Sequence, residues 1–146
     1  MGCQPFLLVL RIVLDTSVVV AALRSRTGAS NEALRLVGMG RMAVLATPAL
    51  FLEYEEVLMR PEQRASHGLS TRQVERFLAA LASAVEPVTI HFAWRPQLRD
   101  PADEMVLEAA INGRAEAIVT FNVKDFIPAG RFGVSAIRPA NLLERI

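Results

Sequence analysis

A short apolar run near the beginning of the chain limits the folds open to it. Residues 8–14 are apolar except for Arg11. A continuous apolar strand is expected where helices cover both faces of a sheet. The run is far shorter than the ~20 residues that span a bilayer, and no small-residue cleavage site follows it. We therefore interpret it as a buried strand, and not as a membrane segment or a signal peptide.

Strand-like and helix-like patterns alternate along the rest of the chain. Further strands are predicted at residues 42–46, 88–92, 116–120 and 134–137. Helices are predicted at residues 17–23, 31–39, 48–59 and 101–112, after residue 70, and from residue 139 onward. Residues 60–69 are polar and are predicted to form a loop. This alternation is typical of an α/β domain with a mainly parallel sheet between two layers of helices.

Local signals mark several helix ends. Thr47 followed by Pro48 predicts a cap with proline in the first turn. Ser70 and Gln73 have the spacing of a capping box. Asp100 before Pro101 predicts another cap, and Gly113 is expected to end the helix that begins there.

Composition narrows the class of protein. The 146 residues are expected to form one domain, residues 1–146, because a chain of this length buries about 70% of its surface on folding. The net charge of +1 creates no overall attraction for nucleic acid, so such binding needs a local basic patch. The single cysteine, Cys3, excludes an internal disulfide and indicates a cytoplasmic protein.

Aspartate is rare and unevenly placed. The chain has four aspartates, each where a strand or helix is expected to meet a loop: Asp15, Asp100, Asp103 and Asp125. In parallel sheets, sites form outside the carboxyl ends of the strands, and Asp15 directly follows the first apolar run. Thr16 and Ser17 can cap the next helix, so Asp15 is not needed as a cap. Gathered carboxylates repel unless a positive charge lies between them, which indicates a divalent metal.

The helix after Asp100 separates three acidic residues by their phase. At about 100° per residue, its inward stripe is Val106, Leu107, Ala110 and Ile111. Asp103 falls in the middle of this stripe, Glu104 at its edge and Glu108 outside it. A carboxylate on a core-facing stripe is costly unless it is paired or metal-bound. Asp103 is therefore the ligand candidate, and Glu104 is an auxiliary candidate.

Two other acidic segments leave alternatives open. Glu53 and Glu55 flank opposite borders of the apolar stripe at residues 50–58, so periodicity does not choose between them. Glu56 points outward and can pair with Arg60 at the i+4 position. Further along, Asn122 and Asp125 can share one pocket if their loop coils. Lys124, the only lysine, is interpreted as an ion-pair partner rather than a phosphate binder.

Four segments together resemble the PIN-domain nucleases and, more narrowly, the VapC-like toxins of toxin–antitoxin systems. The segments contain Asp15, Glu53, Asp103 and Asn122 in turn, and they are residues 14–18, 53–58, 100–110 and 119–126. They occur in the family's order from Ile12 to the end of the sequence. The resemblance implies a Rossmann-like three-layer α/β/α fold and a metal-dependent ribonuclease (endonuclease) that uses Mg²⁺ or Mn²⁺.

The resemblance also assigns site residues. It makes Asp15, Glu53 and Asp103 the first three catalytic and metal-binding acids, which resolves the choice between Glu53 and Glu55. Many relatives have aspartate where this chain has Asn122, so Asp125 is expected to supply the fourth charge. Thr16, Ser17, Glu104 and Asn122 are expected to be auxiliary. One cysteine and two distant histidines, His67 and His91, give no zinc pattern, and both histidines are interpreted as structural or solvated.

The expected partners follow from the same reading. Arginines near the acidic segments are candidates for binding the RNA backbone: Arg24, Arg26, Arg60 and Arg64, with Arg72 and Arg76 nearby. The resemblance implies an RNA substrate, a cognate antitoxin and a homodimer, with no membrane. Two alternatives remain: a PIN nuclease of RNA processing without an antitoxin, and a catalytically silent PIN module that binds nucleic acid.

Overall fold

A computed structural model describes residues 9–92 and 97–146 of the chain. It contains a five-stranded sheet in the order β3-β2-β1-β4-β5, and each neighbouring pair of strands is parallel. The strands are β1 (Leu10–Leu14), β2 (Met42–Ala46), β3 (Val85–Pro87), β4 (Ala117–Val119) and β5 (Ser135–Ile137). Residue 8, where the first strand is predicted to begin, lies outside the described residues. The predicted α/β class with a parallel sheet is confirmed.

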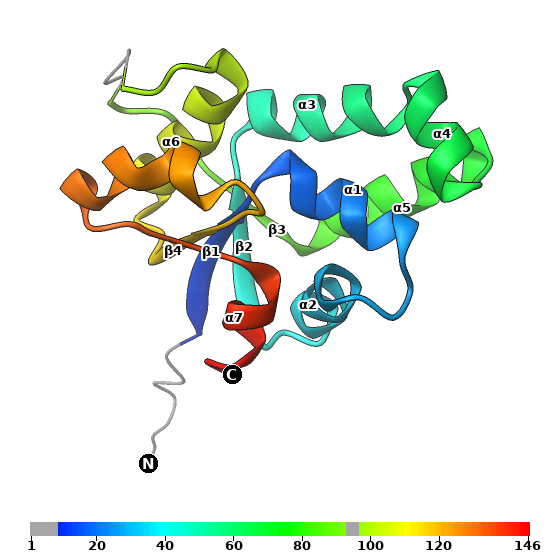
Figure 1. Ribbon diagram of the computed structural model, residues 1–146, viewed down its shortest axis with the longest axis horizontal. Helices are drawn as coiled ribbons and strands as arrows, with labels where there is room; N and C mark the ends of the chain where they lie inside the picture. Colours follow the sequence, from blue (N-terminus) through cyan, green and yellow to red (C-terminus); the bar gives the residue numbers. More distant parts are fainter. Residues whose placement is uncertain (1–8, 93–96) are drawn as a thin grey trace.

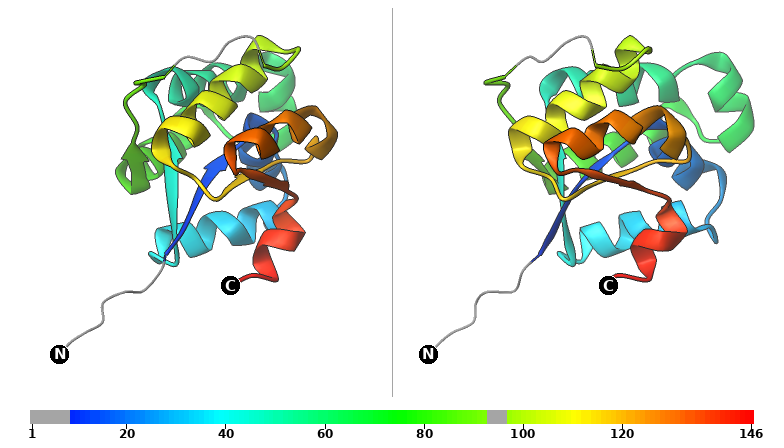
Figure 2. Two further views of the ribbon diagram at one scale, coloured as in Figure 1. Left: turned by 90° about the vertical axis from the view of Figure 1, so that its left-hand side faces the viewer. Right: turned by 60° about the vertical axis from the view of Figure 1, so that its left-hand side comes forward.

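Helices form layers on both faces of this sheet (Figures 1 and 2). They are α1 (Thr16–Arg24), α2 (Ala29–Gly38), α3 (Pro48–Leu58), α4 (Pro61–His67), α5 (Thr71–Ala84), α6 (Pro101–Gly113) and α7 (Pro139–Leu143), with the 3₁₀ helix η1 (Val123–Phe132). The helices α6 and η1 lie over one face, and α2 and α7 lie on the other side of the sheet. In the described part of the chain, no helix is long and apolar enough to cross a membrane.

The predicted caps form as expected. The Thr47 side chain accepts a hydrogen bond from the Leu50 amide at 3.1 Å. Ser70 accepts one from the Gln73 amide, and the Gln73 side chain accepts one from the Ser70 amide, which completes the capping box. Asp100 accepts a bond from the Ala102 amide at 2.9 Å. These local contacts fix where α3, α5 and α6 begin.

The prediction of a loop at residues 60–69 is wrong, because α4 lies there. Pro61 occupies the first turn and Gly68 ends the helix with a φ of 69°, a conformation that favours glycine. His67 accepts a hydrogen bond from the Leu69 amide at Nδ1, and its Nε2 lies 3.3 Å from the Leu58 carbonyl oxygen. His67 therefore has the predicted structural role, which is to hold α4 against the end of α3.

The strand predicted at residues 88–92 is displaced. The β3 strand ends at Pro87, and the backbone beyond it is tied to α6. The Asn112 side chain accepts hydrogen bonds from the amides of His91 and Phe92 and donates one to the Phe92 carbonyl. The hydrogen bonds of the Asn112 side chain thus replace strand pairing at His91 and Phe92. An alternating pattern of apolar residues does not reveal such contacts.

The helix α6 is buried on most of its circumference, and this changes two predictions. Glu108, predicted to lie outside the inward stripe, is buried with 7% exposure. Gly113 is the last residue of α6, and the left-handed residue that follows the helix is Arg114, at a φ of 55°. A Cβ atom at Gly113 would lie 2.8 Å from Leu45 Cδ1 and 2.9 Å from Val88 Cγ2. Close packing of α6 on the sheet, and not helix termination, explains this glycine.

Candidate metal-binding active site

Asp15 stands where β1 ends and α1 begins, at the carboxyl rim of the sheet. Its amide continues the β1–β4 ladder by donating to the Val119 carbonyl at 2.9 Å. Asp15 occupies the N-cap position of α1, but its side chain does not bond to the helix amides. The capping role predicted for Thr16 or Ser17 is therefore wrong. The Asp15 carboxylate is buried, with 6% exposure, and it does not serve the helix that follows it.

Two hydroxyl groups hold the Asp15 carboxylate in place. The Ser17 and Thr120 hydroxyls both donate to its Oδ2 atom, at 2.8 Å and 2.7 Å. Among the described residues, no hydrogen bond reaches Oδ1. Ser17 thus contacts the predicted first acid, and its auxiliary role in catalysis stays a prediction. One carboxylate oxygen is fixed by the protein, and the other is left for a ligand.

Thr120 is absent from the predicted set, although it is fully buried at the end of β4. Its hydroxyl also accepts a hydrogen bond from the Asn122 amide at 2.9 Å, so it links Asp15 to the loop that carries Asn122 and Asp125. A buried hydroxyl after the apolar residues 117–119 is the signal in the sequence that marks it. Tyr54, also absent from the predicted set, supports the same corner by donating its hydroxyl proton to the Leu14 carbonyl.

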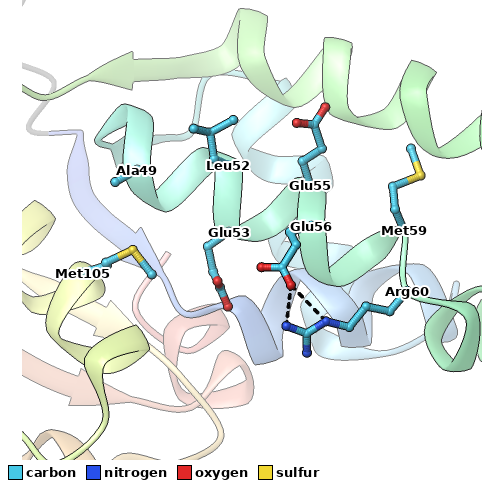
Figure 3. Close-up of a pocket in the computed structure, with 8 residues that line it drawn as sticks. All are labelled: Ala49, Leu52, Glu53, Glu55, Glu56, Met59, Arg60 and Met105. Atoms are coloured by element: carbon cyan, nitrogen blue, oxygen red, sulfur yellow. Dashed lines mark hydrogen bonds and ion pairs between the residues drawn. The ribbon is translucent and has the colours of Figure 1, made fainter.

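Glu53 and Glu55 lie on different sides of α3, as Figure 3 shows. Glu53 is half-buried and Glu55 is exposed. Burial raises the pKa of the Glu53 carboxyl above its ordinary value, the negative charge of Glu56 raises it further, and Arg60 lowers it. The charges of Asp100 and Asp15 also raise this pKa. Of the two glutamates left open by periodicity, Glu53 is therefore the one that is half-buried and whose pKa is raised by the charge of Asp15.

Asp103 lies in the first turn of α6 and is partly buried. Burial is the main cause that raises the pKa of its carboxyl to about 6. Four neighbouring carboxylates raise it further, in the order Asp15, Asp100, Asp125 and Glu104. Negative charges from β1, α6 and η1 thus meet at one rim, and repulsion between them makes ionised Asp103 costly.

A pocket of ≈ 440 Å³ adjoins this rim. It is lined by Gln97, Leu98, Arg99, Asp100, Asp103, Lys124, Asp125 and Pro128. The predicted coiling of the loop occurs: η1 starts after Asn122, and the Asp125 amide donates to the Asn122 carbonyl at 3.0 Å. The Asp125 side chain lines the pocket beside Asp103, whereas Asn122 is not among the lining residues. Asp125 is thus better placed than Asn122 to add charge next to Asp103.

Glu104 has a different role from the one predicted. It is buried, with 4% exposure, and its Oε1 atom accepts hydrogen bonds from the amides of Gln97 and Leu98. This carboxylate holds the segment before α6 against the helix. Helical periodicity places Glu104 at an edge of the inward stripe, because the spacing of apolar residues does not reveal that a second segment covers that side of the helix.

The predicted RNA-binding arginines are all exposed, but two of them have partners. Arg60 pairs with Glu56 at 2.6 Å, as its i+4 spacing predicts. Arg24 donates to the Gln63 side chain at 2.9 Å, which connects α1 to α4. Arg60 and Glu56 also line a second pocket, of ≈ 690 Å³, together with Glu53 and Met105 (Figure 3). Arg26 and Arg64 are exposed, and their proposed contact with RNA stays a prediction.

The donor atoms at this rim suit a hard divalent cation. Asp15, Glu53, Asp103 and Asp125 offer only carboxylate oxygens, the ligands that Mg²⁺ and Mn²⁺ accept. A cation would also offset the repulsion that raises the pKa of Asp103. Within the described ranges, no three His, Cys, Asp or Glu side chains are grouped closely enough to form a metal site. The assignment of these four acids as metal ligands therefore stays a prediction, and Mg²⁺ commonly completes its shell with water.

Comparison with known families shows which family the chain belongs to. The family model described as the PIN domain matches residues 11–124. The chain belongs to the PIN-domain family. PIN domains are a family of nucleases that generally depend on metal ions, and the parallel sheet flanked by helices is consistent with this membership. A comparison with curated proteins gave no match.

Proposed function

We propose that this PIN domain is a Mg²⁺- or Mn²⁺-dependent endoribonuclease, and that it is the toxin of a type II toxin–antitoxin pair. One observation carries the nuclease part of the proposal. Burial is the main cause that raises the pKa values of Asp103 and Glu53, and the charges of Asp15 and Asp100 at the same rim of the sheet raise both values further. Perturbed pKa values of this kind are concentrated at functional sites.

The acidic residues have different roles in the proposed phosphodiester hydrolysis. Ser17 and Thr120 hold Oδ2 of Asp15. The Oδ1 atom therefore keeps a fixed direction, and little side-chain entropy is lost when it binds a ligand. Asp103 and Glu53 supply negative charge from the two helices that approach this rim. The bound metal would supply an activated water and stabilise negative charge on the phosphate during in-line attack. The protein's own task is to position the phosphate against these acids.

The test of the nuclease proposal is cleavage of single-stranded RNA by the purified protein with EDTA, Mg²⁺ or Mn²⁺. Cleavage is expected only with metal and should be lost in Asp103→Asn. Binding of RNA without cleavage under every metal condition would favour the silent binding module. Glu55→Gln is the matched control, because Glu55 lies on α3 near Glu53 but is exposed on another side of the helix.

The toxin role rests on the resemblance in sequence and needs a separate test. Expression of the chain should arrest growth of a bacterial host, and expression of the Asp103→Asn variant should not. Co-expression of a short neighbouring gene should restore growth and yield a stable complex. An active nuclease that leaves growth unaffected and has no such neighbour would instead be an RNA-processing enzyme. The proposed homodimer can be checked on the same sample by light scattering.

A further inference from the structure

Lys124 lies in the acidic pocket but pairs with none of its carboxylates. It lines the pocket together with Asp100, Asp103 and Asp125. Among the described residues, ion pairs join Arg11 to Glu86, Arg35 to Glu32 and Arg60 to Glu56. Lys124 takes part in none of them, and no hydrogen bond is recorded for its side chain within the described residues. The interpretation of Lys124 as an ion-pair partner is therefore wrong for this structure.

The backbone around Lys124 is held in place by contacts before and after it. Thr120 holds the Asn122 amide at the end of β4, and the Asp125 amide bonds to the Asn122 carbonyl. Phe126 is fully buried, with 1% exposure. The backbone at position 124 is thus anchored before and after, while the side chain itself is exposed. Because its backbone is anchored and its ammonium group is unpaired, Lys124 can reach a ligand in the pocket with little loss of backbone entropy.

The side-chain type fits a phosphate group. Lysine carries a compact charge with three donors on a flexible stem, and it binds phosphate oxygen as a point charge. Fifteen of the sixteen basic residues are arginine, so the one lysine stands in the pocket that contains Asp103. An RNA phosphate that approaches four carboxylates is repelled unless positive charge is present. In-line attack adds further negative charge to that phosphate.

We propose that Lys124 binds a phosphate of the RNA in this pocket and holds it beside Asp103. The inference rests on the proposed ribonuclease function and adds the group that offsets phosphate charge at the acidic rim. It also explains why Lys124 leaves the nearby aspartates unpaired, because an ammonium locked to Asp100 or Asp125 could not serve the substrate. Lys124 is therefore a substrate-binding residue and not part of the metal site.

The first test measures binding without cleavage. Fluorescence anisotropy of a short labelled single-stranded RNA is recorded in EDTA, with the Asp103→Asn variant as background, over a range of salt concentrations. Adding Lys124→Ala should weaken binding several-fold and make the slope of log K against log salt shallower by about 0.7, the value for one lost phosphate contact on a single strand. Arg41→Ala is the control, because Arg41 is exposed at the opposite rim, before β2, and its slope should not change.

The second test measures turnover with Mg²⁺. Lys124→Ala should lower kcat/KM by about 10²-fold, and Lys124→Arg should retain an intermediate rate, while the melting temperature of both variants stays at the parent value. An unchanged salt slope together with parental cleavage by Lys124→Ala would overturn the assignment. It would also be overturned if high Mg²⁺ fully restored Lys124→Ala, because Lys124 would then act on the metal site. A parent protein that never cleaves RNA would defeat the nuclease proposal, and the salt slope would still decide the role of Lys124.

Discussion

The two rims of the sheet treat charge in opposite ways. At the amino rim, Arg11 of β1 makes two hydrogen bonds to Glu86 of β3, at 3.2 Å and 2.8 Å, and one to the Gly113 carbonyl at 2.9 Å. At the carboxyl rim, the charges of Asp15, Asp100, Asp125 and Glu104 raise the pKa of Asp103, and the nearby Lys124 pairs with none of these carboxylates. Charge is therefore paired at the amino rim, whereas at the carboxyl rim like charges lie near Asp103.

The pKa values express the same contrast. The hydrogen bond from Arg11 lowers the pKa of the Glu86 carboxyl below its ordinary value, so ionised Glu86 stabilises the fold. Burial and neighbouring carboxylates raise the pKa of Asp103 to about 6, so ionised Asp103 destabilises it. The Arg11–Glu86 pair and the carboxyl rim thus have opposite signs of electrostatic free energy.

The largest expected effect comes from neutralising the carboxyl rim. Asp15→Asn and Asp103→Asn should each reduce RNA cleavage by about 10³-fold, because each removes a charge that the metal requires. In metal-free buffer, Asp103→Asn should also keep or raise the free energy of unfolding, by about 1 kcal/mol after allowance for solvent screening. Cleavage assays and urea unfolding check the two halves. Clear loss of stability in both variants would mean that these acids are structural.

The next effect tests the packing behind the amino rim. Gly113→Ala should destabilise the protein by about 1–3 kcal/mol, because the new Cβ would meet the side chains of Leu45 and Val88 in a packed core. Urea unfolding of the metal-free protein measures this. Gly38→Ala serves as the control, since a Cβ there meets no atom within 4 Å. Equal stability of the two variants would contradict the close approach of α6 to β2.

The pH dependence of the free energy of unfolding should differ between the two rims, and a variant at the carboxyl rim is enough to measure it. The contribution of Asp103 to stability is present below its ordinary pKa of 3.8 and is lost as the pH rises through about 6. The contribution of Glu86 is present above its ordinary pKa of 4.5 and is lost as the pH falls through its lowered folded value. The difference in unfolding free energy between parent and Asp103→Asn should therefore change mainly between pH 3.8 and about 6. A difference that is constant with pH would exclude the raised pKa of Asp103.

A smaller effect distinguishes two aspartates of the same pocket. Asp100→Asn removes the carboxylate cap of α6 and should cost at most about 1 kcal/mol of stability, with a modest loss of cleavage rate. Asp125→Asn should leave stability unchanged, weaken Mg²⁺ binding and slow cleavage, with partial recovery at high Mn²⁺. Thermal melting and metal titration of both variants check this. Parental cleavage by Asp125→Asn beside an inactive Asp100→Asn would reverse the two roles.

The smallest effect is expected at the Arg11–Glu86 pair. Glu86→Gln should cost about 0.2–1 kcal/mol, because both side chains are partly exposed to solvent. Added salt should weaken this pair, so the parent and Glu86→Gln should become closer in stability at high ionic strength. Added salt should also reduce the difference in unfolding free energy between the parent and Asp103→Asn, where the variant is expected to be the more stable of the two. Unfolding curves at two salt concentrations measure both trends.

Several features of this protein follow from local sequence alone. The apolar run before Asp15 determined a buried strand in a parallel sheet, and the spacings at Thr47, Ser70 and Asp100 determined where three helices begin. Glu56 and Arg60 form their ion pair because residues four apart on a helix are neighbours. These predictions succeed because each depends on the geometry of one element.

Only the tertiary structure decided which polar groups meet across elements. The sequence could not place Thr120 against Asp15, which are 105 positions apart, nor direct Glu104 to the segment before α6. It also assigned Glu108 to the surface, because a helical stripe assumes one buried face whereas α6 is covered on most sides. Periodicity reports how residues are arranged on a single helix. The pKa of Asp103 and the unpaired charge of Lys124 depend on what other strands and helices bring beside them, and that is set by packing.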